Sequence, residues 1–220
     1  MVPSRGATRT ALMALSLAIG LSFSPITPAS PVSYQGNFAN DNDLVALSFS
    51  ITSSAGGSIS ARTFSYNGGV NAAGATVASG GFAPVLTLFG SDGYEVFSAS
   101  TNVPCSGLSF CWDADLEFST TLAGSYTLVL SQDGNFSNGS LMDGYAHDAD
   151  PNYTALNLGS LGDPNATFIQ IDGTQRTAHW AFDLNVVNTP VGGTVPEPAS
   201  TALVGAALGV LAVLRRRPAR

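Results

Sequence analysis

Four oxygen-bearing side chains are consecutive at Asn40, Asp41, Asn42 and Asp43, directly before an apolar run. Carboxylate and amide oxygens are the ligands that calcium prefers in proteins. One interpretation is therefore a calcium site with Asn40, Asp41 and Asp43 as its ligands, and calcium is the only cofactor that the sequence indicates. The alternative is a turn, because Asn and Asp side chains readily accept hydrogen bonds from nearby backbone N–H groups.

The sequence offers few residues for catalysis. Asp113 and Asp115 resemble the acid pairs of glycosidases, with turn capping or calcium binding as the alternatives. Only His147 and His179 could serve a Ser-His-Asp triad; the first lies among acids in an irregular stretch and is expected to be solvated, and the second lies in a strand pattern, where a structural role is expected. No nucleophile-elbow, zinc-protease, phosphate-loop or dinucleotide motif is present. The sequence therefore predicts a protein that is not an enzyme.

Aromatic side chains in turns could stack on sugar rings. Tyr94, Phe136, Tyr145 and Tyr153 occupy expected turns or loops, whereas both tryptophans are expected in the core. A carbohydrate-binding module is therefore one alternative function. A secreted hydrolase is a second alternative, against which the missing motifs argue.

Short β-rich runs separated by Gly, Asn, Asp and Ser are the elements that must position these side chains. Alternation of apolar and polar residues predicts strands over 43–51, 58–66, 84–89, 94–99, 116–122, 125–130, 168–171 and 178–187. About eight short strands with glycine-rich turns predict an all-β fold, a single antiparallel β-sandwich or jelly roll. The stretch 133–167 is too long for a plain connection and is interpreted as either a functional excursion or a floppy insertion.

Both ends of the chain read as targeting segments. Arg5 and Arg9 precede an apolar run at 11–23, which predicts a signal peptide over 1–29 that begins as a helix. The body is then a β-sandwich domain over 30–190, followed by a short linker at 191–194.

The stretch 195–220 contains a Pro-Glu-Pro turn, an uncharged apolar run and a basic cluster. The 16 residues of the run predict a transmembrane helix of about 24 Å, a length that can cross if the bilayer thins. Arg215, Arg216 and Arg217 would hold its end on the cytoplasmic side, so that the body is exported. A buried core helix is the alternative.

The charge and the cysteines fit an exported body. Six of the eight basic residues lie in the terminal segments, which leaves two arginines and, counting Glu197, fifteen acids, a net charge near −13. Such a body repels nucleic acid, which is excluded as a partner. Cys105 and Cys111 enclose five residues, and in an exported chain this even count favours a disulfide.

The C-terminal segment resembles the PEP-CTERM sorting signal of Gram-negative bacteria. The resemblance rests on Pro196, Glu197 and Pro198, on the apolar run and on the basic cluster, which occur together and in order. It implies an exosortase-type membrane protease as a partner, a transient stay in the bacterial membrane, removal of the helix, and release to the cell surface or the exopolysaccharide matrix.

The body resembles the DVUA0089 family, whose segments are similar to bacterial pre-peptidase C-terminal domains. The resemblance runs from about Tyr34 to Val187 through YQGNFANDNDLVALSF, RTFSYNGGVNAAG, GGFAPVLTLF, CWDADLEFSTTLAGSYTLVLSQDGNF and QRTAHWAFDLNV, with a departure at 140–167. It implies a jelly-roll sandwich. The expected function is a structural or adhesive role in extracellular polysaccharide, with that polysaccharide as a second partner.

Overall fold

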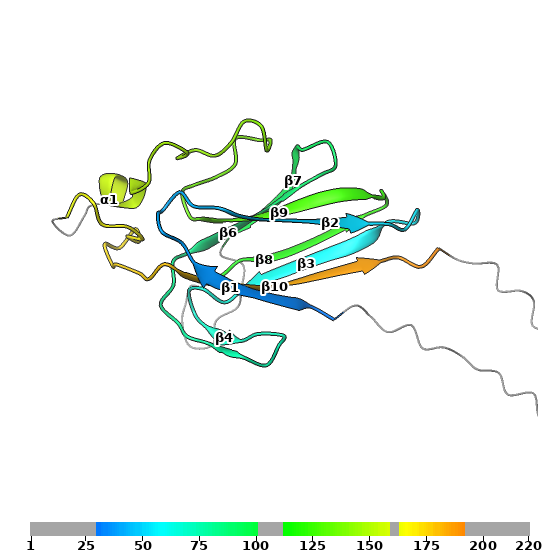
Figure 1. Ribbon diagram of the computed structural model, residues 1–220, viewed down its shortest axis with the longest axis horizontal. Coiled ribbons are helices and arrows are strands. Elements are labelled where there is room, and N and C mark those ends of the chain that lie inside the picture. Colours follow the sequence, from blue (N-terminus) through cyan, green and yellow to red (C-terminus); the bar gives the residue numbers. More distant parts are fainter. Residues whose placement is uncertain (1–29, 101–111, 159–162, 192–220) are drawn as a thin grey trace, which may run out of the picture.

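The computed structural model describes residues 30–100, 112–158 and 163–191, which form a sandwich of two four-stranded antiparallel sheets (Figure 1). The first sheet has the order β1 (Val32–Asn37), β10 (His179–Asn188), β3 (Gly57–Thr63) and β8 (Asp115–Thr120). The second sheet has the order β2 (Val45–Ile51), β9 (Gly124–Gln132), β6 (Pro84–Phe89) and β7 (Glu95–Ser100). A small hairpin, β4 (Gly69–Val70) and β5 (Thr76–Val77), and a six-residue helix α1 (Tyr153–Leu158) lie in the connections.

The chain passes repeatedly from one sheet to the other. The first sheet contains β1, β3, β8 and β10, and the second contains β2, β6, β7 and β9. Strands from the two ends of the sequence are neighbours, because β1 pairs with β10 and β2 pairs with β9. This strand order is that of a jelly roll. The predicted all-β antiparallel sandwich is therefore confirmed.

Seven of the eight predicted strands are present, with their ends moved by a few residues. The predicted strand at 168–171 is wrong: this stretch forms only an isolated bridge from Ile169 to Gln175. Phe168 has a φ of +58°, which lies outside the extended region that a strand requires. The eighth long strand is β1, which has no clear alternation because Gly36 interrupts it.

The core lies between the two sheets and is formed by the inward side chains of both. Its largest fully buried members include Ile51, Ile59, Phe82, Leu86, Leu88, Leu116, Leu128, Leu130 and Phe182. β6 is buried along its whole length, on both faces. Its outer face is covered by the stretch after β9, where Tyr145 packs with Phe89 and Val129.

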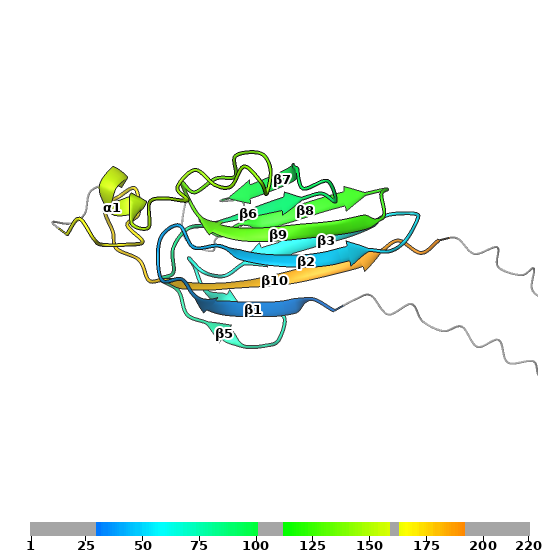
Figure 2. The ribbon, with the colours of Figure 1, turned by 45° about the horizontal axis from the view of Figure 1, so that its top comes forward.

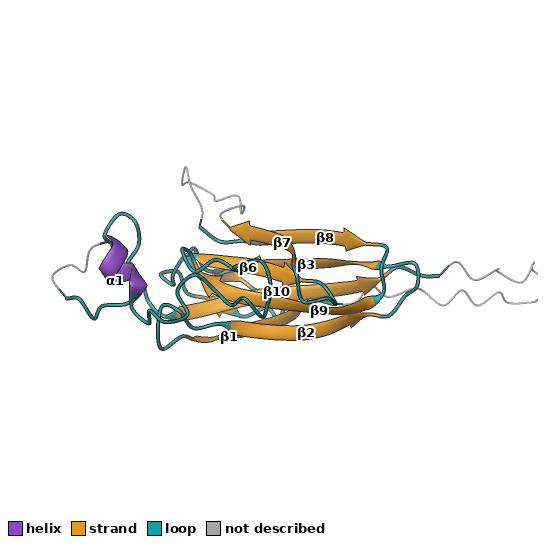
Figure 3. Cartoon of the chain, turned by 90° about the horizontal axis from the view of Figure 1, so that it is seen from above, coloured by secondary structure: helices purple, strands orange, loops and turns teal. Residues whose placement is uncertain are grey.

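The two ends of the sandwich differ in their connections. At one end, here called the terminal end, lie the short turns 52–56, 90–94 and 121–123 and the points where the described chain begins and stops (Figure 2). At the opposite end, the loop end, lie the connections 38–44 and 64–83 and the described parts of two others, namely 112–114, 133–158 and 163–178. Figure 3 shows α1 projecting beyond the strands at the loop end. Among the described residues, the long connections therefore lie at the end opposite to the points where the described chain begins and stops.

Several predictions fall outside the described residues. They are the signal peptide at 1–29, the cysteine pair Cys105 and Cys111, and the sorting segment 195–220. Within residues 30–100, 112–158 and 163–191, no helix is long and apolar enough to span a membrane.

Candidate functional site

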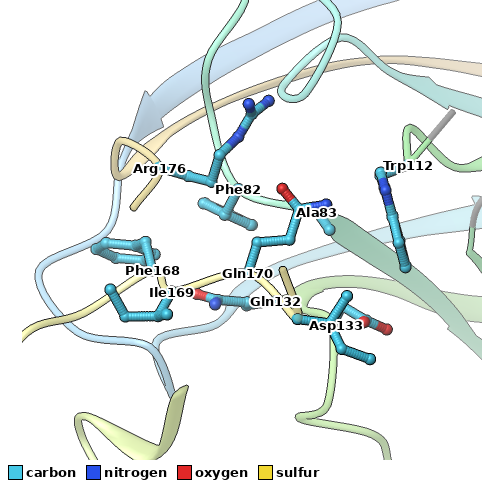
Figure 4. Close-up of a pocket in the computed structure, with 10 residues that line it drawn as sticks. Phe82, Ala83, Trp112, Gln132, Asp133, Phe168, Ile169, Gln170 and Arg176 are labelled. Atoms are coloured by element: carbon cyan, nitrogen blue, oxygen red, sulfur yellow. The ribbon is translucent and has the colours of Figure 1, made fainter. Parts of the chain in front are cut away.

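A small cavity opens at the loop end, where three connections meet the end of β9 (Figure 4). Its volume is about 30 Å³, which is room for one or two water molecules. Ten residues line it: Phe82, Ala83, Trp112, Gln132, Asp133, Phe168, Ile169, Gln170, Ile171 and Arg176. They come from the approaches to β6, β8 and β10 and from the end of β9. The site is thus assembled from parts of the chain that are far apart in sequence.

The apolar part of the cavity is rigid. The rings of Phe82 and Phe168 are stacked with centroids 5.5 Å apart, and Ile169 is fully buried beside them. Phe168 keeps its positive φ because its N–H donates to the Asp41 carboxylate. A bulky residue in this conformation is strained, and such strain persists only where the surroundings enforce it.

The polar part of the cavity is made by the end of β9. Gln132 is only 4% exposed, and its Oε1 atom has no hydrogen-bond partner among the described residues. Burial raises the pKa of the neighbouring Asp133 carboxyl above its usual value of 3.8. A hydrogen bond from the Gly134 N–H opposes this rise only in part. The Tyr153 hydroxyl donates to the Asp133 carbonyl at 2.6 Å and fixes the backbone there. The cavity therefore presents two hydrogen-bond acceptors, an amide oxygen and a carboxyl group.

Arg176 holds two of the connections together. Its guanidinium carbon lies 3.7 Å from the centroid of the Tyr66 ring. Its Nε and Nη2 atoms donate to the carbonyls of Gly81 and Tyr66, each at 3.0 Å. The Tyr66 hydroxyl in turn donates to Gln170 Oε1 at 2.9 Å. These bonds give Arg176 a structural task at the mouth of the cavity.

Of the three predicted calcium ligands, Asn40 and Asp43 lie together, with Asn40 Nδ2 3.4 Å from Asp43 Oδ1, whereas the Asp41 carboxylate bonds elsewhere. Asp43 Oδ2 accepts from the N–H groups of Ala39 at 2.6 Å and Asn40 at 3.0 Å, which is the turn named as the alternative. Asp41 is fully buried and its carboxylate accepts from Thr154 N at 2.9 Å, from Thr154 Oγ1 and from Phe168 N. Within the described part of the chain, no group of three or more His, Cys, Asp or Glu side chains could hold a metal ion. Calcium binding stays a prediction. The observed bonds place Asp43 in a turn and connect Asp41 to a distant stretch of the chain.

Asp41 is the anchor of the long stretch after β9. Burial raises the pKa of its carboxyl, and the bonds from Thr154 and Phe168 oppose that rise. The N–H of Asp41 donates to the Pro151 carbonyl at 2.9 Å, so that both backbone and side chain bind the same distant stretch. The interpretation of 133–167 as a floppy insertion is wrong for its described residues, because they are packed on the sheet and bonded to Asp41.

Asp113 and Asp115 do not form an acid pair. Asp113 is buried and accepts from Thr63 Oγ1 at 3.0 Å and from the N–H groups of Tyr66 and Asn67, so it caps the start of the 64–83 connection. Asp115 is the first residue of β8 and lies opposite Arg62 of β3. The turn-capping alternative is therefore confirmed for Asp113.

The two histidines have different surroundings. His179 starts β10 and pairs with Asn37 of β1. His147 is half-buried rather than fully solvated, since its ring stacks on Tyr153 with centroids 4.0 Å apart. Its Nδ1 atom lies 3.4 Å from Asp150 Oδ2.

The aromatic candidates for sugar stacking divide into two groups. Tyr94 and Phe136 are 62% and 48% exposed, as the sequence predicts. Tyr145 and Tyr153 are 5% and 3% exposed, so their prediction as binding residues is wrong. Both fix the stretch after β9 to the sandwich. Trp112, expected in the core, is only half-buried and lines the cavity.

Sequence reasoning missed the polar lining of the cavity. Gln132 and Asp133 follow an apolar strand and precede a glycine, a position that ordinarily signals a turn. Arg176 carries a usable signal, because it is one of only two arginines in an acidic body. No pattern in the sequence brings these residues to Trp112, since the strand order alone does so.

No family model matches the chain, and no curated protein matches it either.

Proposed function

We propose that the chain is an exported bacterial surface or extracellular-matrix protein, sorted and processed through its Pro-Glu-Pro segment, with a structural or adhesive role in exopolysaccharide. The observation that carries the proposal is the asymmetry of the sandwich. Both ends of the described chain lie at the terminal end, and the described residues of the long connections lie at the loop end. A tail held in a membrane would therefore present the loop end outward.

The composition supports the same proposal. Counting Glu197, the body has a net charge of −13, and 45% of the whole chain is hydrophobic, with six of the eight basic residues kept in the terminal segments. An acidic sandwich stays soluble outside the cell and avoids anionic lipid. Asp113 caps a turn and Asp115 lies opposite Arg62, so these two residues give no support to the alternative of a secreted hydrolase.

Deletion of 195–220 tests the proposal. We expect the truncated protein to move from the envelope or matrix fraction to the free medium. Glu197→Ala should keep the apolar run but impair processing, so that the full-length species accumulates in the membrane fraction. Ser200→Ala, inside the apolar run, is the matched control and should behave as the wild type. An unchanged distribution of the truncated protein would contradict the proposal.

The cavity at the loop end favours a second candidate, a carbohydrate-binding module. The cavity itself has room only for one or two water molecules, so a sugar would lie at its mouth. There the half-buried Asp133 carboxyl is an acceptor that suits a sugar hydroxyl, and the half-buried Trp112 ring lines the same cavity. A glycan array would show saturable binding of a defined oligosaccharide, and Asp133→Ala should weaken it at least about tenfold, the loss expected for one bond to a charged group. Asp92→Ala, at the terminal end, is the control. Absence of saturable binding would exclude this candidate and leave the structural role.

A further inference from the structure

Each sheet of the sandwich has two edge strands, and three of the four carry a protecting feature. The first sheet ends at β1 and β8, the second at β2 and β7. β8 contains Asp115 and Glu117, and β7 starts at Glu95, beside a register shift of the β6–β7 ladder. Charges and bulges of this kind prevent an edge from pairing with another chain.

β1 is held by a neighbouring turn. The hydroxyl of Ser33 donates to Asp183 Oδ1 at 2.6 Å and accepts from Ala73 N at 3.1 Å. The N–H of Ala72 donates to the same aspartate, through Oδ2, at 2.8 Å. The turn of the β4–β5 hairpin is thus bonded to β1 and β10.

β2 has no such protection. Its seven residues, VALSFSI, include no charge, proline or glycine. It pairs with β9 on one side, and no described strand pairs with its other side. An edge of this kind exposes backbone N–H and C=O groups that can accept another strand.

The side chains of β2 alternate in a way that suits a partner. Ala46, Ser48 and Ser50 are exposed and small, so a second strand can approach closely. Leu47 and Phe49 contact the core but remain half-exposed at the margin of the sandwich. A strand added at this edge would cover their remaining apolar surface, which favours association.

We infer that β2 is a self-association surface, on which β2 of a second copy of this chain pairs antiparallel about a twofold axis at Ser48. This register places Leu47 opposite Phe49 and Val45 opposite Ile51 on the inner face. On the outer face it places Ala46 opposite Ser50, and Ser48 opposite itself. The two second sheets then join into one continuous sheet. Such an interface is isologous, so it closes at the dimer.

Charge selects this edge over the others. An acidic body resists self-association because like charges repel. Self-pairing of β8 would bring Asp115 and Glu117 of both copies into one interface, and β7 carries Glu95, whereas β2 contains no carboxylate. Asp43, the acid nearest to β2, lies outside the strand and has its Oδ2 bonded to Ala39 N and Asn40 N. Self-pairing goes beyond the proposed export and sorting and does not depend on them.

Cross-linking at the axis tests the inference in the full chain. Directly opposite residues in an antiparallel pair have Cβ atoms about 4.5–5.5 Å apart, within reach of a short bifunctional thiol reagent. Ser48→Cys should therefore give a covalent dimer on a non-reducing gel. Ser119→Cys is the matched control, because Ser119 is an exposed serine on the edge strand β8, and it should give none. Equal cross-linking at both positions, or none at Ser48→Cys, would overturn the inference.

A charge at the same position gives an independent reading. Ser48→Lys places two like charges opposite each other and should raise the dimer dissociation constant at least about tenfold in sedimentation experiments on the full chain. Ser119→Lys should leave that constant unchanged, and circular dichroism would verify that both variants fold. A wild-type chain that stays monomeric, or a Ser48→Cys chain that captures only a foreign protein, would refute self-pairing. Neither result would change where the tail directs the protein, so the two proposals fail separately.

Discussion

The terminal end and the loop end of the sandwich both fix connections against the strands, but the connections differ in length. Each must hold connections against the strands, and each does so with one side chain that accepts several backbone N–H groups. At the terminal end, Asn188 Oδ1 accepts from Thr52 N at 2.6 Å and Ser53 N at 3.1 Å, exposed to water. At the loop end, Asp41 accepts from Thr154 and Phe168 and is fully buried.

The difference follows from the length of what is held. The 52–56 turn orders few residues, so one exposed amide is sufficient, whereas the 133–178 connection must order many more. Buried bonds to a charged group are worth more than exposed neutral ones, because water no longer competes for the donors. The loop end is therefore stabilised by a few buried contacts, and loss of one of them affects a large region.

Asp41→Ala should give the largest effect of a single substitution at either end. It leaves the N–H groups of Thr154 and Phe168 buried without an acceptor. We expect the free energy of unfolding to fall by about 3 kcal/mol, which urea titration of the wild type and the variant would measure. Hydrogen exchange should increase first in residues 151–158 and 163–170, before the core strands.

Asp41→Asn refines that prediction. The amide keeps one acceptor but turns an N–H₂ group toward one of the same donors, so the loss should be smaller than for alanine but not absent. A variant as stable as the wild type would mean that Asp41 does not anchor the loop end.

Asn188→Ala is the corresponding change at the terminal end. The Thr52 and Ser53 N–H groups that lose their acceptor are exposed and can bond to water instead. We expect a loss of about 1 kcal/mol in the free energy of unfolding, with hydrogen exchange altered only near 52–56. Equal losses for Asn188→Ala and Asp41→Ala would remove the distinction between the two ends.

The sequence predicts the strands of this protein better than its loop end. Alternation identifies β2 and β3, because each has one face toward the core and a two-residue period follows from that geometry. The apolar run 84–89 predicts β6. The burial of both faces of this strand, however, depends on the stretch after β9, which packs on its outer face. A local sequence pattern is enough to predict a strand where burial alternates from one residue to the next.

The loop end depends on contacts between distant residues. Asp41 bonds Thr154 and Phe168, which lie 113 and 127 residues away, and no local pattern carries that information. The aspartates at 41 and 43 have the same chemistry in sequence but opposite environments, one buried and one in a turn. The positive φ of Phe168 likewise follows from its bond to Asp41. This backbone conformation is incompatible with the strand that the side-chain pattern of 168–171 predicts.

Asp133→Asn should give the smallest effect, and its dependence on pH tests how the cavity at the loop end is built. Burial raises the pKa of the Asp133 carboxyl above 3.8 in the folded state. The folded state then holds its proton more tightly than the unfolded state, so the wild type loses stability as pH rises from below 3.8 through the raised pKa. The asparagine variant lacks this loss. Its free energy of unfolding relative to the wild type should therefore increase with pH between about 3 and 7.

Asp172→Asn is the matched control on the same end, with the opposite sign. The Thr174 N–H bonds the Asp172 carboxylate and lowers the pKa of that exposed group below 3.8. Asp172 thus stabilises the folded state above the unfolded pKa, and this contribution is lost as pH falls through the lowered value. Relative to the wild type, the Asp172→Asn variant should lose stability as pH rises while Asp133→Asn gains it. Parallel pH profiles for the two variants would mean that burial at the cavity does not destabilise the charged form of the Asp133 carboxyl. The loop end would then have no functional group that is maintained at a cost in stability.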